Sequence, residues 1–489
     1  MVLKILAAAY EYFPTDYTVH VATGLIGVLA TYRIAQGRKT TRERDLHARV
    51  VVLTGAFTPL GLTLLEALAK RGAHVIALTP NSVADERVST FIDLLRSTTS
   101  NENIYAEECD LASPPSIQAF AARFVKGTSP GPGPGAGPNL EPPRVDALVF
   151  AHEYAGVGAW GAFSGREAAP AVEQMQRDEG ALGTFLFLTL LLPALLTAPV
   201  ERDIRIVNVV NRFYAAAAPR IFKHGTYAFE GLFSSAPSTE PLSAKATTKS
   251  KSTEVQASPI PREATRALRT IILTRHLQRV LDALPSAPVP NPSENPADAP
   301  PPTYVQKSNV VAVSVSPGLS RSETVAPLFG LTSGSRWGWL FYVLLYPLLL
   351  LFAKSSSASI QSVLHVLFLP TPIKVKAKAK TPTDQEPEEA LKPGALYAEC
   401  SVVKLEIAAP LPSSTRPSEG ASEGAKGKGK EKEKEELTEI PDDGELGGEA
   451  GGRAVWEAYE AGLKVWELVH PTPAPINPMG NAEPGAVKS

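Results

Sequence analysis

The sequence predicts an α/β fold in which helices cover a doubly wound parallel sheet, and residues 49–80 support this prediction most strongly. Residues 50–53 are uncharged and mostly β-branched, which suits a strand buried on both faces of a sheet. Leucines then recur at helical spacing until Gly72 ends the helix, and a second apolar strand follows at 74–78. A strand, a helix and a strand in this order form the first βαβ unit of a parallel sheet.

The turn between the first strand and the helix, residues 54–61 with the sequence TGAFTPLG, predicts a nucleotide-binding site. Gly55 allows a tight turn, Gly61 allows the helix to pack closely on the strand, and the free amides at the helix start would face a pyrophosphate. The alternative is an α/β turn that binds no nucleotide. The strand before the turn and the helix after it favour a Rossmann-type unit.

This turn resembles the TGxxxGxG turn of the short-chain dehydrogenase/reductase family. Pro59 stands where the family has its middle glycine, and a proline has no amide to offer a phosphate. With interruptions, the resemblance extends from about Arg49 to Cys400. It implies a Rossmann-type oxidoreductase with NAD or NADP as cofactor, and no charged residue near Pro80 selects between the two.

The remaining strands and helices alternate along the chain as such a fold requires. Predicted strands lie at 103–111, 145–151, 203–210 and 309–316, and predicted helices at 82–97, 113–125, 180–196 and 263–284. The helix at 180–196 is apolar enough for a membrane span, but Pro193 and its place between two strands favour a buried helix. In the family the corresponding helix often forms a dimer interface, so the resemblance implies a possible homodimer.

Low-complexity segments divide the chain into predicted regions. Residues 1–48 form an anchor helix and basic linker, 49–409 the Rossmann domain, 410–452 a disordered linker, and 453–489 a helix and tail. Within the domain, long disordered loops are expected at 127–143, 222–262, 285–307 and 371–393, which hold few apolar residues or many prolines and glycines. Residues 455–469 have the pattern of an amphipathic helix that docks on the domain or on a membrane.

Charge and cysteine content exclude several classes of protein. The chain has 489 residues and a net charge of −2, from 48 basic and 50 acidic residues, so nucleic acid is not expected as a partner. Its two cysteines, Cys109 and Cys400, lack the spacing of metal ligands. Neither a metal site nor a disulfide framework is therefore expected.

The N-terminal segment 17–35 is mostly apolar, and five basic residues follow it at positions 38, 39, 42, 44 and 49. These features predict an uncleaved membrane anchor whose basic flank keeps the folded domain on the cytosolic side of an internal membrane such as the endoplasmic reticulum. The alternative is an amphipathic helix packed on the domain.

The resemblance also implies which residues bind the cofactor. Motif by motif, they are Thr54, Gly55 and Gly61 in the turn, Asp110 and Leu111 beside the adenine, and Pro317, Gly318 and Ser322 in the segment that resembles HPGxVxT.

The four catalytic positions of the family hold other residue types in this chain. The pattern of residues 271–281 places the family tyrosine at Glu263 and its lysine at Ala267, and the other two positions fall at Asn211 and Gly180. A phenol that titrates near pH 10 needs the nearby lysine to exchange protons at working pH. Glu263 would act as an acid only if burial raised its pKa, whereas the Asn211 amide could donate a hydrogen bond to an oxyanion.

Other residues near these positions offer a rebuilt catalytic site. Tyr214 and Tyr227 precede the helix, but neither has a lysine four residues on, and Lys223, Lys245 and Lys249 would have to approach from the loop. Packing roles are favoured for both tyrosines. Residues 150–153 (FAHE) replace the family's NNAG, and His152, Glu153 and Tyr154 are interpreted as strand-end hydrogen-bonding groups rather than catalytic ones.

The order of elements after residue 336 resembles the retinol-dehydrogenase-like members of the family. An apolar segment at 337–353 precedes a helix at 358–369 and a strand at 394–400. The tryptophans and tyrosines of the apolar segment at 337–353 suit a helix that lies in the membrane interface. The alternative is that this segment belongs to a buried helix pair.

Two functions are compatible with these features. The first is a membrane-associated NAD(P)-dependent oxidoreductase acting on a lipophilic alcohol or carbonyl compound. The alternative is a catalytically inactive pseudo-reductase that serves as a membrane-tethered scaffold or binds lipid or nucleotide.

Overall fold

The computed structural model describes residues 18–126, 145–160, 163, 169–198, 202–217, 259–284, 309–331, 334–372, 389–405 and 448–471. Most of the predicted loops and the linker lie outside the described residues, as do Tyr227, Lys223, Lys245 and Lys249. The predicted division of the chain into regions therefore stays a prediction.

One eight-stranded sheet forms the centre of the protein, in the order β3-β2-β1-β4-β5-β6-β7-β8. The strands are β1 (Val50–Thr54), β2 (His74–Thr79), β3 (Ile104–Glu108), β4 (Ala147–Phe150), β5 (Ile204–Val209), β6 (Val310–Ser316), β7 (Leu396–Ala398) and β8 (Ser401–Val403). All neighbouring strands are parallel except β7 and β8. The predicted doubly wound sheet is confirmed, and its strand order reverses between β1 and β4.

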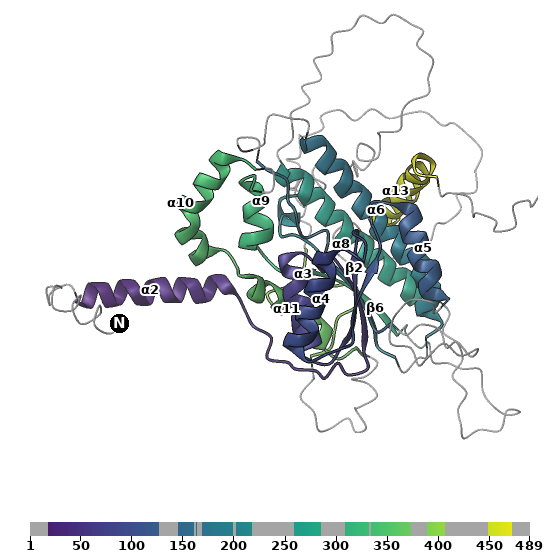
Figure 1. Cartoon of the computed structure of the whole chain (residues 1–489), viewed down its shortest axis with the longest axis horizontal. Helices are drawn as coiled ribbons and strands as arrows, with labels where there is room; N and C mark the ends of the chain where they lie inside the picture. The colour runs from purple at the N-terminus through teal and green to yellow at the C-terminus, as the bar shows by residue number, and fades with distance from the viewer. Residues whose placement is uncertain are drawn as a thin grey trace, which may run out of the picture.

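Helices cover both faces of the sheet and form two separate apolar cores (Figure 1). One face packs against α3 (Pro59–Ala69), α4 (Glu86–Thr99) and α11 (Ser356–Phe368). The other packs against α5 (Pro114–Val125), α6 (Ala169–Leu196), α8 (Pro259–Ala283) and α13 (Gly448–Val469). Strands buried on both faces explain the continuous apolar runs of the sequence.

Helix α3 begins at Pro59, two residues before the predicted start. Thr58 caps it by accepting a hydrogen bond from the amide of Gly61 at 3.1 Å. Proline suits this first helical position because its φ is already helical and its missing amide would have no partner inside the helix. The residue that departs from the family's glycine pattern thus helps to start the helix.

Helix α6 is the one helix in the described ranges that is long and apolar enough to cross a membrane, over Gln176–Leu196. Phe185, Phe187 and Leu191 are nevertheless buried in the core. The interpretation of this segment as a buried helix is confirmed.

The C-terminal helix α13 begins at Gly448, five residues before the predicted boundary, and packs on α6 and α8. Tyr459 and Trp466 are buried there, and the Trp456 ring lies 5.0 Å from that of Phe185 in an edge-on arrangement. The predicted amphipathic helix therefore docks on the domain. It covers the helix that the family resemblance assigns to a dimer interface.

Two apolar helices project from the domain, α2 (Thr18–Gln36) and α10 (Arg336–Phe352) (Figure 1). They contact each other. The Gln36 side chain, at the end of α2, hydrogen-bonds the carbonyl of Ala353 and the amide of Ser355 just beyond α10. Most of their apolar side chains are exposed, including Ile34 and Leu344. The alternative of a buried helix pair at 337–353 does not describe α10, because most of its large apolar side chains are exposed.

Arg205 on β5 joins the sheet to the end of α11 although its side chain is fully buried. Its guanidinium donates to the Asp203 carboxylate at 2.8 Å, to the carbonyl of Val366 at 2.9 Å and to that of Leu369 at 2.6 Å. A buried guanidinium is tolerated only when its donors are satisfied in this way.

We expect Arg205→Met to destabilise the fold by about 3–5 kcal/mol, because the change removes the donor to the buried carbonyls of Val366 and Leu369 and leaves Arg44 as the cation beside Asp203. Chemical denaturation measures the difference. Arg453→Met is the control, since that exposed side chain pairs with Glu457 in an i,i+4 contact. Equal losses in the two variants would contradict the role given to Arg205.

Candidate functional site

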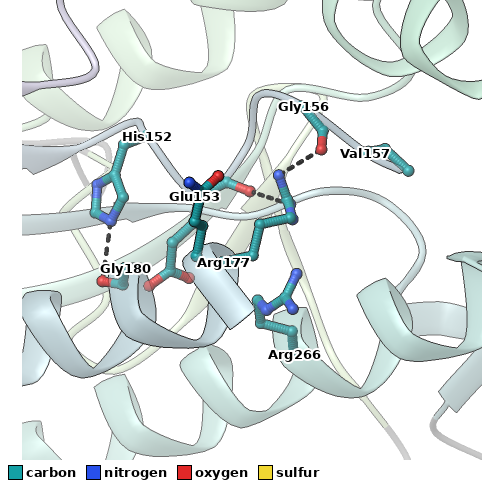
Figure 2. Close-up of a pocket in the computed structure, with 8 residues that line it drawn as sticks. His152, Glu153, Gly156, Val157, Arg177, Gly180 and Arg266 are labelled. Carbon is teal, nitrogen blue, oxygen red and sulfur yellow. Dashed lines mark hydrogen bonds between the residues drawn. The ribbon is translucent and has the colours of Figure 1, made fainter. Parts of the chain in front are cut away.

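A pocket of about 300 Å³ opens at the carboxyl end of β4, beside the point where the strand order reverses (Figure 2). It is lined by the loop after β4, by α6 and by α8. Its lining residues are His152, Glu153, Gly156, Val157, Gln176, Arg177, Gly180 and Arg266. Doubly wound sheets bind their ligands in this position.

Two arginines hold the Glu263 carboxylate at the wall of this pocket. Arg177 of α6 forms a two-pronged pair with it, with distances of 2.8 Å from Nε and 2.5 Å from Nη2. Arg266, one turn along α8, donates to the same carboxylate and at 3.0 Å to Asp178. Two-pronged arginine–carboxylate pairs are among the stronger polar contacts in proteins.

The condition under which Glu263 would act as an acid, a pKa raised by burial, is not met. Burial alone would raise its pKa, but Arg177 and Arg266 outweigh burial and hold the pKa below its ordinary value. Glu263 is therefore an ionised, paired carboxylate at neutral pH and has no proton to give.

The other three family positions have separate surroundings. The Asn211 amide, which could donate to an oxyanion, donates to Glu263 Oε2 at 3.2 Å. Gly180 lines the pocket through its backbone, whose carbonyl lies 3.2 Å from His152 Nε2. Ala267 is buried in the apolar core one turn along α8. The structure thus brings Asn211 and Glu263 into contact, and Gly180 lies in the lining of the pocket beside Arg177.

His152 links β1, the loop after β4 and α6. Its Nδ1 lies 2.8 Å from the Thr54 hydroxyl, and its Nε2 lies 3.1 Å from the Thr184 hydroxyl. Because the carbonyl of Gly180 can only accept, Nε2 carries the proton and Nδ1 accepts from Thr54. Burial lowers the pKa of His152, so the ring is neutral at neutral pH.

The neighbouring titratable residues make strand-end and packing contacts. Glu153 accepts hydrogen bonds from Thr184 at 3.0 Å and Thr270 at 2.8 Å. The Tyr154 hydroxyl donates to the carbonyl of Gly318 at 3.0 Å. Tyr214 is buried in the core, and burial raises its pKa. These contacts agree with the structural roles expected from the sequence.

The turn after β1 has the backbone shape of a dinucleotide-binding turn. Gly55 has a φ of +65°, and a Cβ there would lie 2.7 Å from the backbone nitrogen of His152. A Cβ on Gly61 would lie 2.0 Å from the carbonyl oxygen of Gly55. Neither position has room for a side chain, which supports the reasons given for both glycines.

The amides of this turn are engaged inside the protein. The Gly61 amide donates to the Thr58 hydroxyl, and the Leu60 amide donates to the carboxylate of Glu323. Since Pro59 has no amide, the helix start fits a dinucleotide in shape but offers its phosphate no free amide among residues 59–61.

The other predicted cofactor residues lie at carboxyl ends of strands, on the same edge of the sheet. Asp110 follows β3, where its carboxylate accepts from the Ala112 amide, and the Leu111 carbonyl packs against Gly183 of α6. Pro317 and Gly318 follow β6, and the Ser322 hydroxyl lies 3.2 Å from that of Ser320. The Glu323 contact brings this last segment against residues 54–61. Cofactor roles for all eight residues stay predictions.

Arg177, Arg266 and Glu323 were not identified from the sequence. A signal existed for Arg266, because Glu263 and Arg266 are spaced for an ion pair on one helix face. Arg177 and Glu323 reach partners far away in the chain, and no local pattern marks such pairs.

The sheet order, the glycine turn and the pocket at the reversal point define a Rossmann-type α/β protein. The sequence profile of the KR domain matches residues 49–130. An uncharacterized oxidoreductase of Saccharomyces cerevisiae is 27% identical over 351 residues, which cover 70% of this chain and 74% of that protein. Another from Schizosaccharomyces pombe is 28% identical over 216 residues, covering 44% of this chain and 53% of that protein.

Mouse retinol dehydrogenase 13 is 28% identical over 191 residues, which cover 39% of this chain and 50% of that protein. Among solved structures, the NADPH-bound short chain oxidoreductase from Pseudomonas aeruginosa with an atypical catalytic center aligns over 73% of this chain and 96% of its own. The TM-score is 0.41 and the identity 16%. The chain is therefore similar to oxidoreductases of the short-chain dehydrogenase/reductase family, and its relatives include retinol dehydrogenases of that family.

The low pKa of Glu263 predicts how stability depends on pH. A carboxyl whose pKa is lower in the folded state stabilises the fold above its unfolded value of about 4.5, and this contribution is lost as the pH falls through the folded value. We expect Glu263→Gln to unfold at a lower temperature than the unchanged protein at pH 7, and this difference to shrink in acid below pH 4.5. Thermal unfolding at a series of pH values measures it.

Glu66→Gln is the matched control, because Glu66 pairs with Lys70 on an exposed face of α3 and should change little at any pH. A gap between Glu263→Gln and the unchanged protein that stayed constant in acid would show that the ion pairs do not hold Glu263 ionised.

Proposed function

We propose that this protein is a membrane-associated, NAD(P)-binding oxidoreductase that acts on a lipophilic alcohol or carbonyl compound. The observation that carries the proposal is the pocket at the reversal point of the sheet, beside a turn that only glycine at position 55 can form. Similarity to this family supports NAD or NADP as the cofactor. A bound nicotinamide would supply or accept the hydride, and the wall formed by Gly180, His152 and Val157 would position the substrate.

Contacts between the pocket loop and α10 support a lipophilic substrate. The loop that lines the pocket continues to Trp160, whose amide donates to the carbonyl of Leu328 at 2.9 Å. The ring of Phe163 then lies 5.3 Å from that of Phe329 and 5.6 Å from that of Phe341 on α10. A substrate dissolved in lipid around α10 would therefore enter close to the pocket.

The surface formed by α2 and α10 supports membrane association. Trp337 and Trp339 are 70% and 59% exposed, and Leu344 is 72% exposed. Two apolar helices exposed side by side suit the interface of a bilayer better than water. Arg38 and Lys39, directly after α2, would face anionic lipid headgroups and keep the domain on the cytosolic side of an internal membrane, whereas Arg44 and Arg49 pair with carboxylates of the domain.

One observation favours a second candidate function. The position of the family's acid is held by an ionised Glu263 that both arginines neutralise, and Ala267 supplies no charge. A pseudo-reductase that binds nucleotide or lipid without turnover is compatible with this pocket.

Calorimetry with NADPH and NADH tests cofactor binding. We expect the unchanged protein to bind at least one of them saturably, and Gly55→Ala to lose that binding because its Cβ would meet the backbone of His152. Gly24→Ala is the control, since nothing lies within 4 Å of a Cβ there. Circular dichroism checks that each variant is folded.

Absence of binding in the folded, unchanged protein would overturn the cofactor proposal. Binding without turnover of a panel of long-chain and cyclic aldehydes and alcohols would favour the pseudo-reductase instead.

Flotation with vesicles of phosphatidylcholine and phosphatidylserine tests the membrane surface. We expect the protein to float, and removal of residues before Thr40 or the pair of changes Trp339→Ser and Leu344→Ser to weaken flotation several-fold, because each removes apolar surface from the bilayer.

Leu468→Ser is the matched control, because Leu468 is equally apolar and 82% exposed but lies on α13, on the far side of the domain (Figure 1). If all variants floated as well as the unchanged protein, α2 and α10 would not form the membrane surface.

A further inference from the structure

We propose that Glu323 is an internal anion that occupies the phosphate position of the cofactor turn, so that a dinucleotide must displace it to bind. This inference rests on the proposed function, because it concerns the same site. It makes Glu323 a residue that sets cofactor affinity.

The geometry places the carboxylate where a phosphate is expected. Glu323 lies in η2 (Arg321–Val325), a short π-helix after β6, and its Oε1 accepts a hydrogen bond from the amide of Leu60. Leu60 is the second residue of α3, whose start carries the partial positive charge of the helix dipole. In Rossmann-type folds the pyrophosphate lies at this helix start.

The first residues of α3 have little else to offer an anion. Pro59 lacks an amide, and the amides of Gly61 and Leu62 are bonded to the hydroxyl and the carbonyl of Thr58. Of the first amides of α3, the one at Leu60 is therefore the one that a phosphate would compete for. The ionised form of Glu323 and a phosphate are both negatively charged, so they cannot share it.

Burying the Glu323 carboxylate costs free energy. A competing anion can therefore displace it more readily. Glu323 is 3% exposed, and its Oε2 accepts no hydrogen bond from any described residue. Burial raises its pKa to about 7, against the opposing effects of the Leu60 amide and the Thr58 hydroxyl. The titratable group that faces it across the loop after β4 is the Tyr154 hydroxyl.

If a site is open for only a fraction of the time, its apparent dissociation constant is the intrinsic constant divided by that fraction. If Glu323 closes the turn nine-tenths of the time, its removal strengthens binding about tenfold. Glu323→Gln keeps the size of the side chain and removes its charge, and Glu323→Ala frees the Leu60 amide.

The test is calorimetric titration of the full chain with NADPH, NADH and inorganic pyrophosphate. We expect Glu323→Gln and Glu323→Ala to bind the dinucleotide about tenfold more tightly than the unchanged protein, and to bind pyrophosphate when the unchanged protein does not. Glu66→Gln, the same change on an exposed face of α3, should leave both affinities as they were.

The pyrophosphate and dinucleotide titrations together distinguish the role of Glu323 from the cofactor proposal on which it rests. Pyrophosphate binding to the Glu323 variants without dinucleotide binding would overturn the cofactor proposal and support the role of Glu323. Equal or weaker binding of both probes in folded Glu323 variants, or no binding of either probe to any form, would overturn the role of Glu323.

Discussion

The turn after β1 depends on two approaches of backbone to backbone that exclude any side chain. Gly55 lies against the backbone of His152, and Gly61 lies against the carbonyl of Gly55. The first contact joins the turn to the loop after β4, and the second sets how closely α3 packs on the sheet. The strand order reverses between β1 and β4. The contact between Gly55 and His152 therefore lies at the reversal point, beside the pocket.

Around this rigid turn, the chain has two buried carboxylates where the family resemblance implies other groups. Glu263 stands at the position of a phenol, and two arginines keep it charged. Glu323 lies at the start of α3, in the position proposed for a cofactor phosphate, and the Leu60 amide donates to it. The first carboxylate is paired with cations and has a lowered pKa, whereas the second has no cationic partner among the described residues and has a raised pKa. Cations thus stabilise the charged form of Glu263, whereas burial favours the neutral form of Glu323.

The sequence predicted the strands, the order of the helices and the turn because these depend on local patterns of apolar residues and glycines. The predicted catalytic register stays a prediction, and two of its positions, Asn211 and Glu263, are in contact. The direction of the Glu263 pKa could not be predicted, because Arg177 is 86 positions away. The partner of the Leu60 amide is 263 positions away. Such long-range contacts depend on tertiary packing. No spacing pattern in a single sequence reveals them.

Helix α13 has a consequence for how the protein could associate. It buries Tyr459 and Trp466 against α6 and α8, and α6 is the helix through which the family resemblance implied pairing with a second copy. Because α13 belongs to the same chain, its effective concentration at that face does not fall on dilution. A second copy would have to compete with a segment that is always present. This face of α6 and α8 is already covered by α13 of the same chain. A second copy would therefore associate more easily through another surface of the protein.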